Sequence, residues 1–240
     1  MTPYAALLDR VRRDPSAPLV TYRDLATGER MELSAASFAN AVAKTAGLLR
    51  DELDAQPGAI VGVHLPLHWQ RVMWLGACAA AGTVFAADAD PALCDVLVMD
   101  RARVALAGIA GEDVLVSLAP FGLTEPGGTP PGITDASVAM RGHPDSFTPH
   151  QPPSEGITWL REPAGDLPQG EAMARAAAEL ARRGVGAGQR FALIEPEAGV
   201  DLLALAGPLV SGGSVVLVTQ PDAGDVEATL REEGAQVARG

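Results

Sequence analysis

The chain has 240 residues, of which 48% are hydrophobic and 20% are charged, a composition typical of soluble globular proteins. Its formal net charge is −12 and no basic patch is present, so nucleic acid and anionic membrane surfaces are disfavoured as partners. No apolar run approaches the ~20 residues of a membrane span, and the amino terminus lacks the apolar stretch of a secretion signal. We therefore expect a soluble, cytoplasmic protein.

Periodicity and turn residues predict that strands alternate with helices in the first half of the chain. Ser34 is expected to cap a long amphipathic helix over residues 35–53, whose apolar residues fall on one stripe. A short helix before Pro15 is expected, as are a helix over 66–81 and strands over 19–22, 31–33, 60–65, 83–87, 95–99 and 114–118. This alternation indicates a mostly parallel sheet that is covered by helices.

Residues 120–156 interrupt the pattern, because 14 of these 37 residues are Pro or Gly and no apolar period survives. We interpret the segment as a linker or an irregular arm over the surface. Regular structure resumes with strands over 157–160, 191–194, 214–218 and near 236–237, and with helices over 171–183, 200–210 and 222–233.

The cysteines, Cys78 and Cys94, lie in apolar or near-apolar runs. This setting favours two buried thiols over a disulfide framework, as expected in a reducing cytoplasm.

An internal repeat with an offset of 130 residues connects the two halves. The positions that recur are Gly58, Pro66, Leu75, Gly82 and Pro91, which match Gly188, Pro196, Leu205, Gly212 and Pro221. Apart from the leucine, the matches fall on residues that begin or end elements, so the repeat predicts two related α/β subdomains packed against each other.

The motifs of the first half are VTYRDL at 20–25, PGAIVGVHLP at 57–66 and AGTV at 81–84, and the second half carries AGQR at 187–190 and LVSGGSVV at 209–216. Together they resemble the amino-terminal subdomains of adenylate-forming enzymes, the group of acyl-CoA synthetases, peptide-synthetase adenylation domains and luciferases. The chain is similar to a family of short actinobacterial proteins of this form. The two subdomains of the enzymes share one topology, which agrees with the repeat.

The resemblance also supplies a template for residues 161–170. The phosphate loop of the enzymes reads Thr-Ser-Gly-Ser/Thr-Thr-Gly-x-Pro-Lys-Gly between a strand and a helix, whereas this chain reads REPAGDLPQG. Only Pro168 and Gly170 match, and Gln169 stands at the position of the lysine. Glu162 and Asp166 add carboxylates where a triphosphate would lie, and a like charge at ~4 Å costs about 4 kcal/mol near a protein surface. We therefore interpret Pro168, Gln169 and Gly170 as a degenerate remnant that binds no cofactor.

Other parts of the enzymes' machinery are expected to be absent. Their adenine-binding and magnesium-binding motifs, third subdomain and mobile carboxy-terminal domain would follow the last predicted strand. Lys44 is the only lysine and lies in a predicted helix, so it does not replace the catalytic lysine of the mobile domain. The Pro-x-x-His segment that helps to gate the acyl site reads PEAG at 196–199.

Three further patterns were weighed as sites. The glycine-rich segment 184–188 follows a helix and precedes a strand, the reverse of the phosphate-binding order, so it predicts a helix end. His64 and His68 are separated by Pro66 and are expected to flank a turn. A metal clip built from His143, Asp145 and His150 is left open but weakly specified, and we expect no metal site.

The sequence thus predicts two related α/β subdomains with mostly parallel sheets, at residues 1–119 and 157–240, joined by the arm at 120–156. The favoured function is a non-catalytic binding or assembly module with no catalytic residue and no cofactor. The alternative is an enzyme or binding protein that uses the cleft between the subdomains for an acyl, CoA or nucleotide ligand. Apolar flanks left open by the missing third subdomain predict a homodimer or a protein partner.

Overall fold

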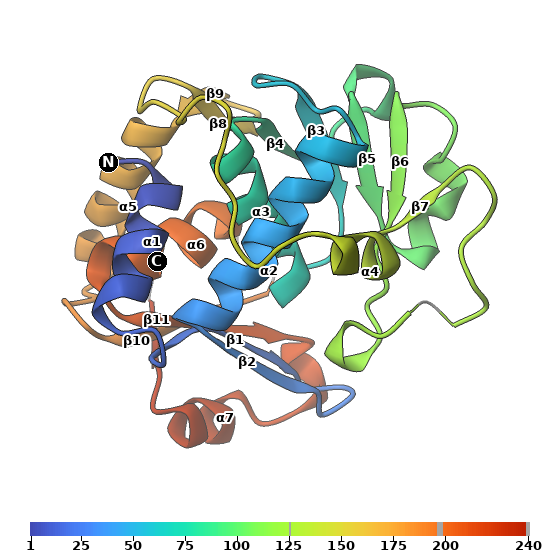
Figure 1. Ribbon diagram of the computed structural model, residues 1–240. Helices are drawn as coiled ribbons and strands as arrows, with labels where there is room; N and C mark the ends of the chain where they lie inside the picture. Colours follow the sequence, from blue (N-terminus) through green and yellow to red (C-terminus); the bar gives the residue numbers. More distant parts are fainter. Residues whose placement is uncertain (125, 196–198, 239–240) are drawn as a thin grey trace.

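The computed structural model describes residues 1–124, 126–195 and 199–238, which form two β-sheets (Figure 1). Within these residues the larger sheet has the order β7-β6-β5-β3-β4-β8-β9, and its neighbours are parallel except for the pair β8–β9. Its strands are β3 (Ile60–His64), β4 (Val84–Ala87), β5 (Val96–Met99), β6 (Glu112–Leu115), β7 (Thr134–Asp135), β8 (Thr158–Glu162) and β9 (Gly165–Pro168).

The smaller sheet has the order β12-β10-β11-β1-β2. Among the residues that the structure describes, its neighbouring strands are parallel except for β1 and β2, which are antiparallel. Its strands are β1 (Pro18–Asp24), β2 (Arg30–Ser34), β10 (Arg190–Ile194), β11 (Ser214–Thr219) and β12 (Gln236–Val237). The pairings confirm the predicted α/β class with mostly parallel sheets.

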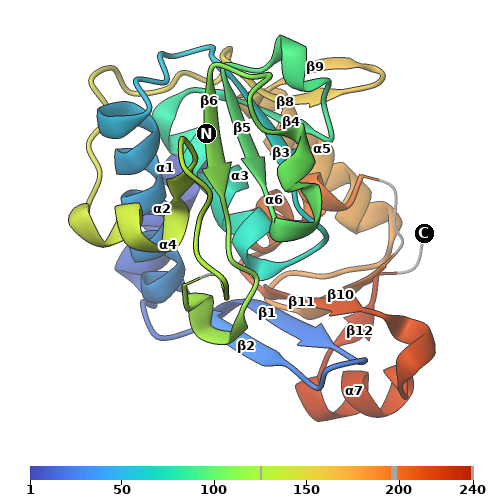
Figure 2. The same cartoon turned by 90° about the vertical axis from the view of Figure 1, so that its right-hand side faces the viewer.

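Helices fill the space between the two sheets, and the buried core joins them. Phe38, Trp74 and Phe191, which come from α2, α3 and β10, are fully buried in one cluster. The helices in this layer are α1 (Pro3–Arg13), α2 (Ala35–Gly47), α3 (Trp69–Ala81), α5 (Gln169–Arg182) and α6 (Val200–Ser211) (Figures 1 and 2). Outside it lie α4 (Ala136–Ala139) and α7 (Val226–Glu233).

Shorter helical turns connect these elements. They are the π-helical turn η1 (Leu48–Glu52) and the 3₁₀ turns η2 (Pro91–Leu93), η3 (Arg101–Leu106), η4 (Pro120–Gly122), η5 (Met140–Gly142) and η6 (Pro221–Ala223). Among the described residues, none of the helices combines the length and the apolar character that crossing a membrane requires.

The helix α3 begins three residues later than the sequence predicted. His68 has an extended backbone, and its side chain accepts a hydrogen bond from the backbone N–H of Gln70 at 3.3 Å. It therefore acts as the N-cap, and α3 starts at Trp69 instead of Pro66.

Both repeated units have the same order of elements, and each gives its hairpin to the other unit. The first unit runs β1–β2, α2, β3, α3, β4, and the second runs β8–β9, α5, β10, α6, β11. However, β1 pairs with β11 in the smaller sheet, whereas β8 pairs with β4 in the larger sheet. Each sheet therefore combines strands from residues 1–119 with strands from residues 157–240.

The repeated glycines have a conformational reason. Gly82 ends α3 with a φ of +76°, and its N–H donates to the carbonyl of Cys78 at 2.9 Å. Gly212 ends α6 with a φ of +72°, and its N–H donates to the carbonyl of Pro208 at 3.0 Å. A left-handed backbone favours glycine because it has no Cβ, so both helix ends keep it.

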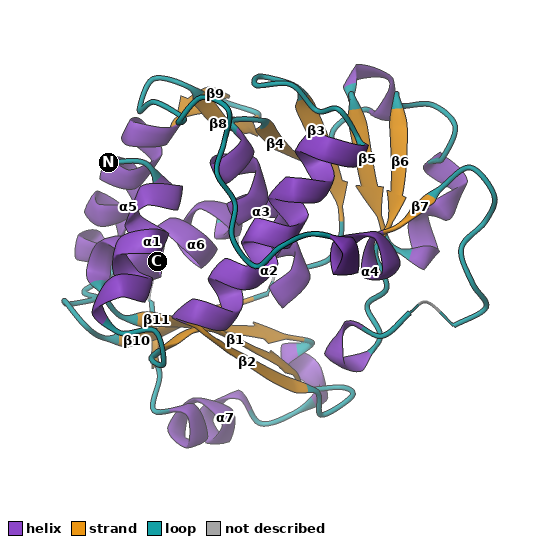
Figure 3. Cartoon of the chain, viewed as in Figure 1, coloured by secondary structure: helices purple, strands orange, loops and turns teal. Residues whose placement is uncertain are grey.

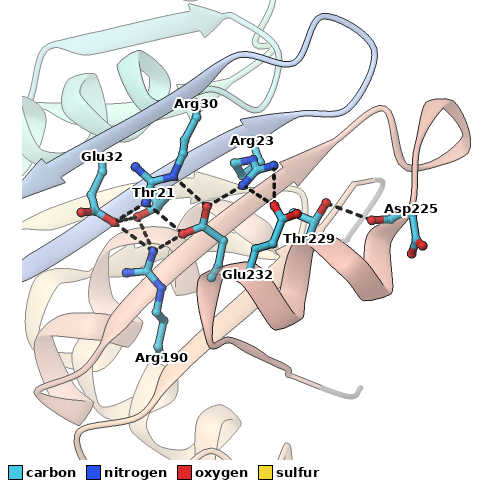
Figure 4. A network of polar contacts seen from close by, with 9 residues as sticks. Thr21, Arg23, Arg30, Glu32, Arg190, Asp225, Thr229 and Glu232 are labelled. Carbon is cyan, nitrogen blue, oxygen red and sulfur yellow. Dashed lines mark hydrogen bonds and ion pairs between the residues drawn. The ribbon is translucent and has the colours of Figure 1, made fainter.

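A network of charged side chains attaches α7 to the outer face of the smaller sheet (Figure 4). Glu233, at the end of α7, accepts hydrogen bonds from Arg23 at 2.7 Å, from Arg30 at 2.8 Å and from Arg190 at 2.7 Å. Burial alone would raise the pKa of Glu233, but these hydrogen bonds outweigh it and lower the pKa to about 2. The network therefore needs the carboxylate in its charged form.

Much of the arm at residues 120–156 is irregular, and it crosses the helical layer beside α2 (Figures 1 and 3). Phe147 anchors it, because its ring contacts the Tyr4 ring edge-on at 6.3 Å and its carbonyl accepts the Tyr4 hydroxyl at 2.8 Å. Lys44 donates to the carbonyl of His143 at 2.8 Å and pairs with Asp145 at 2.9 Å. The arm thus lies over the first unit and supplies β7 to the larger sheet.

Both cysteines are buried and free, as predicted. Burial raises the pKa of the Cys78 thiol to about 12 and also raises that of Cys94. Neither thiol is therefore activated as a nucleophile at neutral pH.

Candidate functional site

The segment that resembles the phosphate loop is a β-hairpin. Strands β8 and β9 pair with Arg161 opposite Asp166 and Glu162 opposite Gly165, and Pro163 and Ala164 form the turn. The sequence predicted no strand between the strand over 157–160 and the helix over 171–183, whereas the structure has β9 there. The Pro and Gly residues hid the short second strand, which runs directly into α5 at Gln169.

The remnant residues Pro168, Gln169 and Gly170 lie where β9 passes into α5, and Gln169 is buried whereas Pro168 and Gly170 are partly exposed. Gln169 is 0% exposed, and its side-chain Nε2 donates to the carbonyl of Ala79 at 3.0 Å. A Cβ at Gly170 would lie 2.8 Å from the Cβ of Glu155. The chain itself thus occupies the Gln169 amide nitrogen and the space beside Gly170, while the buried Gln169 Oε1 has no hydrogen-bond partner among the described residues.

The backbone donors at the start of α5 are also occupied. The N–H of Gln169 donates to the carbonyl of Ile157 at 2.9 Å, and that of Gly170 donates to the carbonyl of Glu155 at 2.9 Å. The start of α2 in the other unit has the same arrangement, with Ala35 donating to Ala17 and Ala36 donating to Pro15. The first two backbone N–H groups of the helix thus bind the preceding segment of the chain in both units. They are not directed at an anion.

The hairpin carboxylates Glu162 and Asp166 are neutralised by arginines, contrary to the expectation of two free negative charges. Asp166 forms a bidentate ion pair with Arg161 at 2.8 and 2.9 Å, and Glu162 pairs with Arg175 of α5 at 2.6 Å. The hydrogen bond from Arg161 lowers the pKa of Asp166. Repulsion of a phosphate by these carboxylates is therefore weaker than the sequence suggested. The two arginines are likewise held in ion pairs with the carboxylates.

A cleft of about 330 Å³ opens between this hairpin, the end of β4 and the start of α6. Phe85, Leu160 and Leu202 form its apolar wall, and Asp201 stands at its edge. Asp201 is bound by Arg71 in a bidentate pair, with both N–O distances 2.7 Å. The cleft lies at the carboxyl ends of parallel strands, the usual position of ligand sites in open α/β sheets.

The other candidates from the sequence do not assemble into a site. His64 contacts the carbonyl of Ala89 through Nε2 at 2.8 Å, and His143 contacts Glu52 through Nε2 at 2.9 Å. Among the described residues, no group of three or more His, Cys, Asp or Glu side chains is placed to hold a metal ion. Gly184 and Gly188 have positive φ angles and lie in the turn after α5, as predicted.

The segment that aligns with Pro-x-x-His begins at Pro196, and Pro196, Glu197 and Ala198 lie outside the described residues. The ion pairs that neutralise the charged residues of the cleft were not predicted from the sequence. The repeat carried a signal for one of them, because Asp201 stands 130 residues after Arg71, at the repeat's own offset.

Comparisons with known proteins agree with the fold. No family model matches the chain. In solved structures, the chain resembles an acetoacetyl-CoA synthetase from Streptomyces lividans, with a TM-score of 0.73 and 21% identity, over 92% of this chain and 39% of the synthetase. It also resembles a Brucella canis acyl-CoA synthetase, with a TM-score of 0.75 and 14% identity, over 98% of this chain and 46% of that one. The chain thus spans less than half the length of either enzyme and shares the fold of that portion.

One curated protein is similar along nearly its full length. The TIGR03089 family protein of Mycobacterium tuberculosis (strain ATCC 25618 / H37Rv) is 39% identical over 239 residues, which cover 95% of this chain and 94% of that protein. This identity and coverage establish common membership, and the chain belongs to the TIGR03089 protein family.

Proposed function

We propose that the chain is a non-catalytic relative of acyl-CoA synthetases and acts as a binding module. The observation that carries the proposal is the occupied start of α5, where the N–H groups of Gln169 and Gly170 already donate to the chain's own carbonyls. A phosphate loop needs free donors, and anion binding at a helix start depends on them. The arginines of the hairpin are also held, Arg161 by Asp166 and Arg175 by Glu162.

The test is binding and turnover with Mg-ATP. Millimolar Mg-ATP is expected to leave the melting temperature unchanged, and carboxylate-dependent pyrophosphate exchange is expected to stay at background. The S. lividans acetoacetyl-CoA synthetase serves as the positive control. The double variant Glu162→Gln/Asp166→Asn removes the negative charge and releases Arg161 and Arg175, and it should still not bind Mg-ATP, because the backbone donors remain occupied. Exchange above background by the unmodified protein would overturn the proposal.

An alternative function is favoured by the apolar wall of the cleft. Phe85, Leu160 and Leu202 offer a surface for an acyl chain that does not require the phosphate loop. A thermal-shift series with AMP, CoA and acyl-CoAs separates the two functions. Stabilisation by an acyl-CoA, lost in Leu202→Gln, would support the ligand-binding alternative.

We also propose that the chain forms a homodimer. Leu93, Ile109, Leu123 and Val138 are each more than half exposed, and all lie between residues 93 and 138. Pairing of identical surfaces would cover such side chains. Sedimentation velocity over a wide concentration range decides the question, and a monomer at every concentration would reject the dimer.

A further inference from the structure

A second and larger cavity, of about 580 Å³, lies beneath the turn of the hairpin β1–β2. Its wall includes Asp24 at the end of β1, Glu195 after β10 and Thr219 at the end of β11. These strands are parallel, so the cavity lies at the carboxyl edge of the smaller sheet. It is the counterpart, in the internal repeat, of the cleft at the hairpin β8–β9.

Two buried donors on the wall of this cavity have unused hydrogen-bonding capacity. His68 is 2% exposed, and because its Nδ1 accepts the Gln70 N–H, its proton lies on Nε2. Among the described residues, this Nε2 has no hydrogen-bond partner. Tyr22 is 5% exposed and packs edge-on against His68 at 4.5 Å. Its hydroxyl lies 3.2 Å from the Thr219 hydroxyl, whose single proton has a second acceptor in the Arg23 carbonyl at 3.4 Å. When Thr219 donates to Tyr22, the Tyr22 proton is available to another acceptor.

The His68 ring that offers this Nε2 donor is uncharged at neutral pH. Burial lowers the pKa of His68 to about 4, so the ring is neutral at neutral pH. Burying the N–H of a neutral imidazole without a hydrogen-bond partner costs free energy. A hydrogen bond to a ligand oxygen would recover that free energy.

The charges around the cavity favour a cation. Asp24, Glu29 and Glu195 line it, and the only lining arginine among the described residues is Arg30. Arg30 is already held by Glu233 and by Glu32 outside the cavity. Burial raises the pKa of Glu29, whose Oε1 is buried and has no partner in the described structure. An ammonium group would satisfy this oxygen.

We propose that the cavity binds a small organic ammonium compound that also carries a hydroxyl or carbonyl oxygen. The ammonium group binds Glu29 and Glu195, and the oxygen accepts from His68 Nε2 or from the Tyr22 hydroxyl. The apolar part of the ligand contacts Leu67 of the same cavity. This site is separate from the β8–β9 cleft, so the proposal does not depend on the function proposed for that cleft.

Tyramine is a suitable probe, because it has an ammonium group at one end and a phenol at the other. Titration of the ¹⁵N-labelled protein is expected to shift backbone amides in residues 22–31 and 67–70. In 3-(4-hydroxyphenyl)propanoate a carboxylate replaces the ammonium on the same scaffold, and this compound should not shift them. Phenethylamine lacks the oxygen and should bind several-fold more weakly than tyramine.

Variants assign the contacts. Glu29→Gln and Glu195→Gln should each weaken tyramine binding about tenfold, the loss expected for one charge-assisted hydrogen bond. Glu162→Gln in the other cleft is the matched control and should leave the affinity unchanged. His68→Asn keeps an N-cap acceptor for α3 but removes the Nε2 donor, so it should reduce the preference for tyramine over phenethylamine.

If His68→Asn does not fold, the comparison between tyramine and phenethylamine on the unmodified protein still tests the oxygen contact. Equal binding of the propanoate, shifts located outside the cavity, or no shifts at millimolar tyramine would each overturn the proposal.

Discussion

Arg71 and Asp201 stand at equivalent positions of the two repeated units, 130 residues apart, and form a bidentate ion pair with each other. Arg71 lies near the start of α3, and Asp201 lies near the start of α6. Residues at equivalent positions of two repeated units can contact each other only near the approximate two-fold axis that relates the units. Identical charges there would repel, so a pair of charged residues at this position requires one copy to be a cation and the other an anion.

The first prediction concerns this pair. Arg71 is buried, so Arg71→Met leaves Asp201 without its partner and should lower the free energy of unfolding by about 3 kcal/mol. The double variant Arg71→Met/Asp201→Leu should recover most of the loss. Urea unfolding measures both, and Arg182→Ala in an exposed pair on α5 is the control, with a cost under ~1 kcal/mol. Additive losses in the double variant would contradict the coupling.

The second prediction concerns acid stability. The pKa of Glu233 is about 2 in the folded protein, against an ordinary value of 4.5. Its stabilising contribution is therefore complete above about pH 4.5 and is lost as the pH falls toward 2. Glu233→Gln should lower the melting temperature at neutral pH and flatten its decline in this window. Glu227→Gln, on the exposed side of α7, should behave like the unmodified protein. An unchanged acid decline in Glu233→Gln would refute the assignment.

The third prediction concerns the repeated helix ends. Gly82→Ala and Gly212→Ala force a Cβ into a left-handed backbone and should each cost about 1 kcal/mol. Gly156 has no positive φ and open space around it, so Gly156→Ala should cost nothing and serves as the control. Denaturant unfolding compares the three variants, and equal stability of all three would show that the left-handed caps are not needed.

The fourth prediction concerns the lysine position of the phosphate loop. Gln169→Lys would place an ammonium group at a fully buried position and should destabilise the protein by about 3 kcal/mol without creating Mg-ATP binding. Ala164→Lys adds the same charge at the exposed turn of the hairpin and should be tolerated. Thermal melts with and without Mg-ATP measure both effects. A stable Gln169→Lys protein that binds Mg-ATP would contradict the inward orientation of residue 169.

Local patterns were sufficient to predict much of the fold. Most of the longer strands and helices, the cap at Ser34 and the glycines that end α3 and α6 follow from neighbouring residues, and the structure contains each of them. The pairing of β1 with β11 depends on residues almost 200 positions apart, so no local pattern reports it.

The candidate sites were harder to predict for the same reason. Tyr22 lies on β1, which joins the other unit's sheet, and no local pattern in either segment reports its contact with His68. The burial of Gln169 could not be predicted either. The sequence aligned it with a position of the phosphate loop, whereas the structure places it in the core. A resemblance can align a residue with a functional position, but it does not give the direction of its side chain.

The exchange of hairpins makes the two units dependent on each other for folding. If the second unit unfolds, β8–β9 leaves the larger sheet and exposes β4, and if the first unit unfolds, β1–β2 leaves the smaller sheet and exposes β11. Neither unit has a complete sheet when the other is unfolded, so a partly folded chain would present unpaired strand edges. We therefore expect the chain to unfold as one cooperative unit, because its two repeated units are linked through strands as well as through their common core.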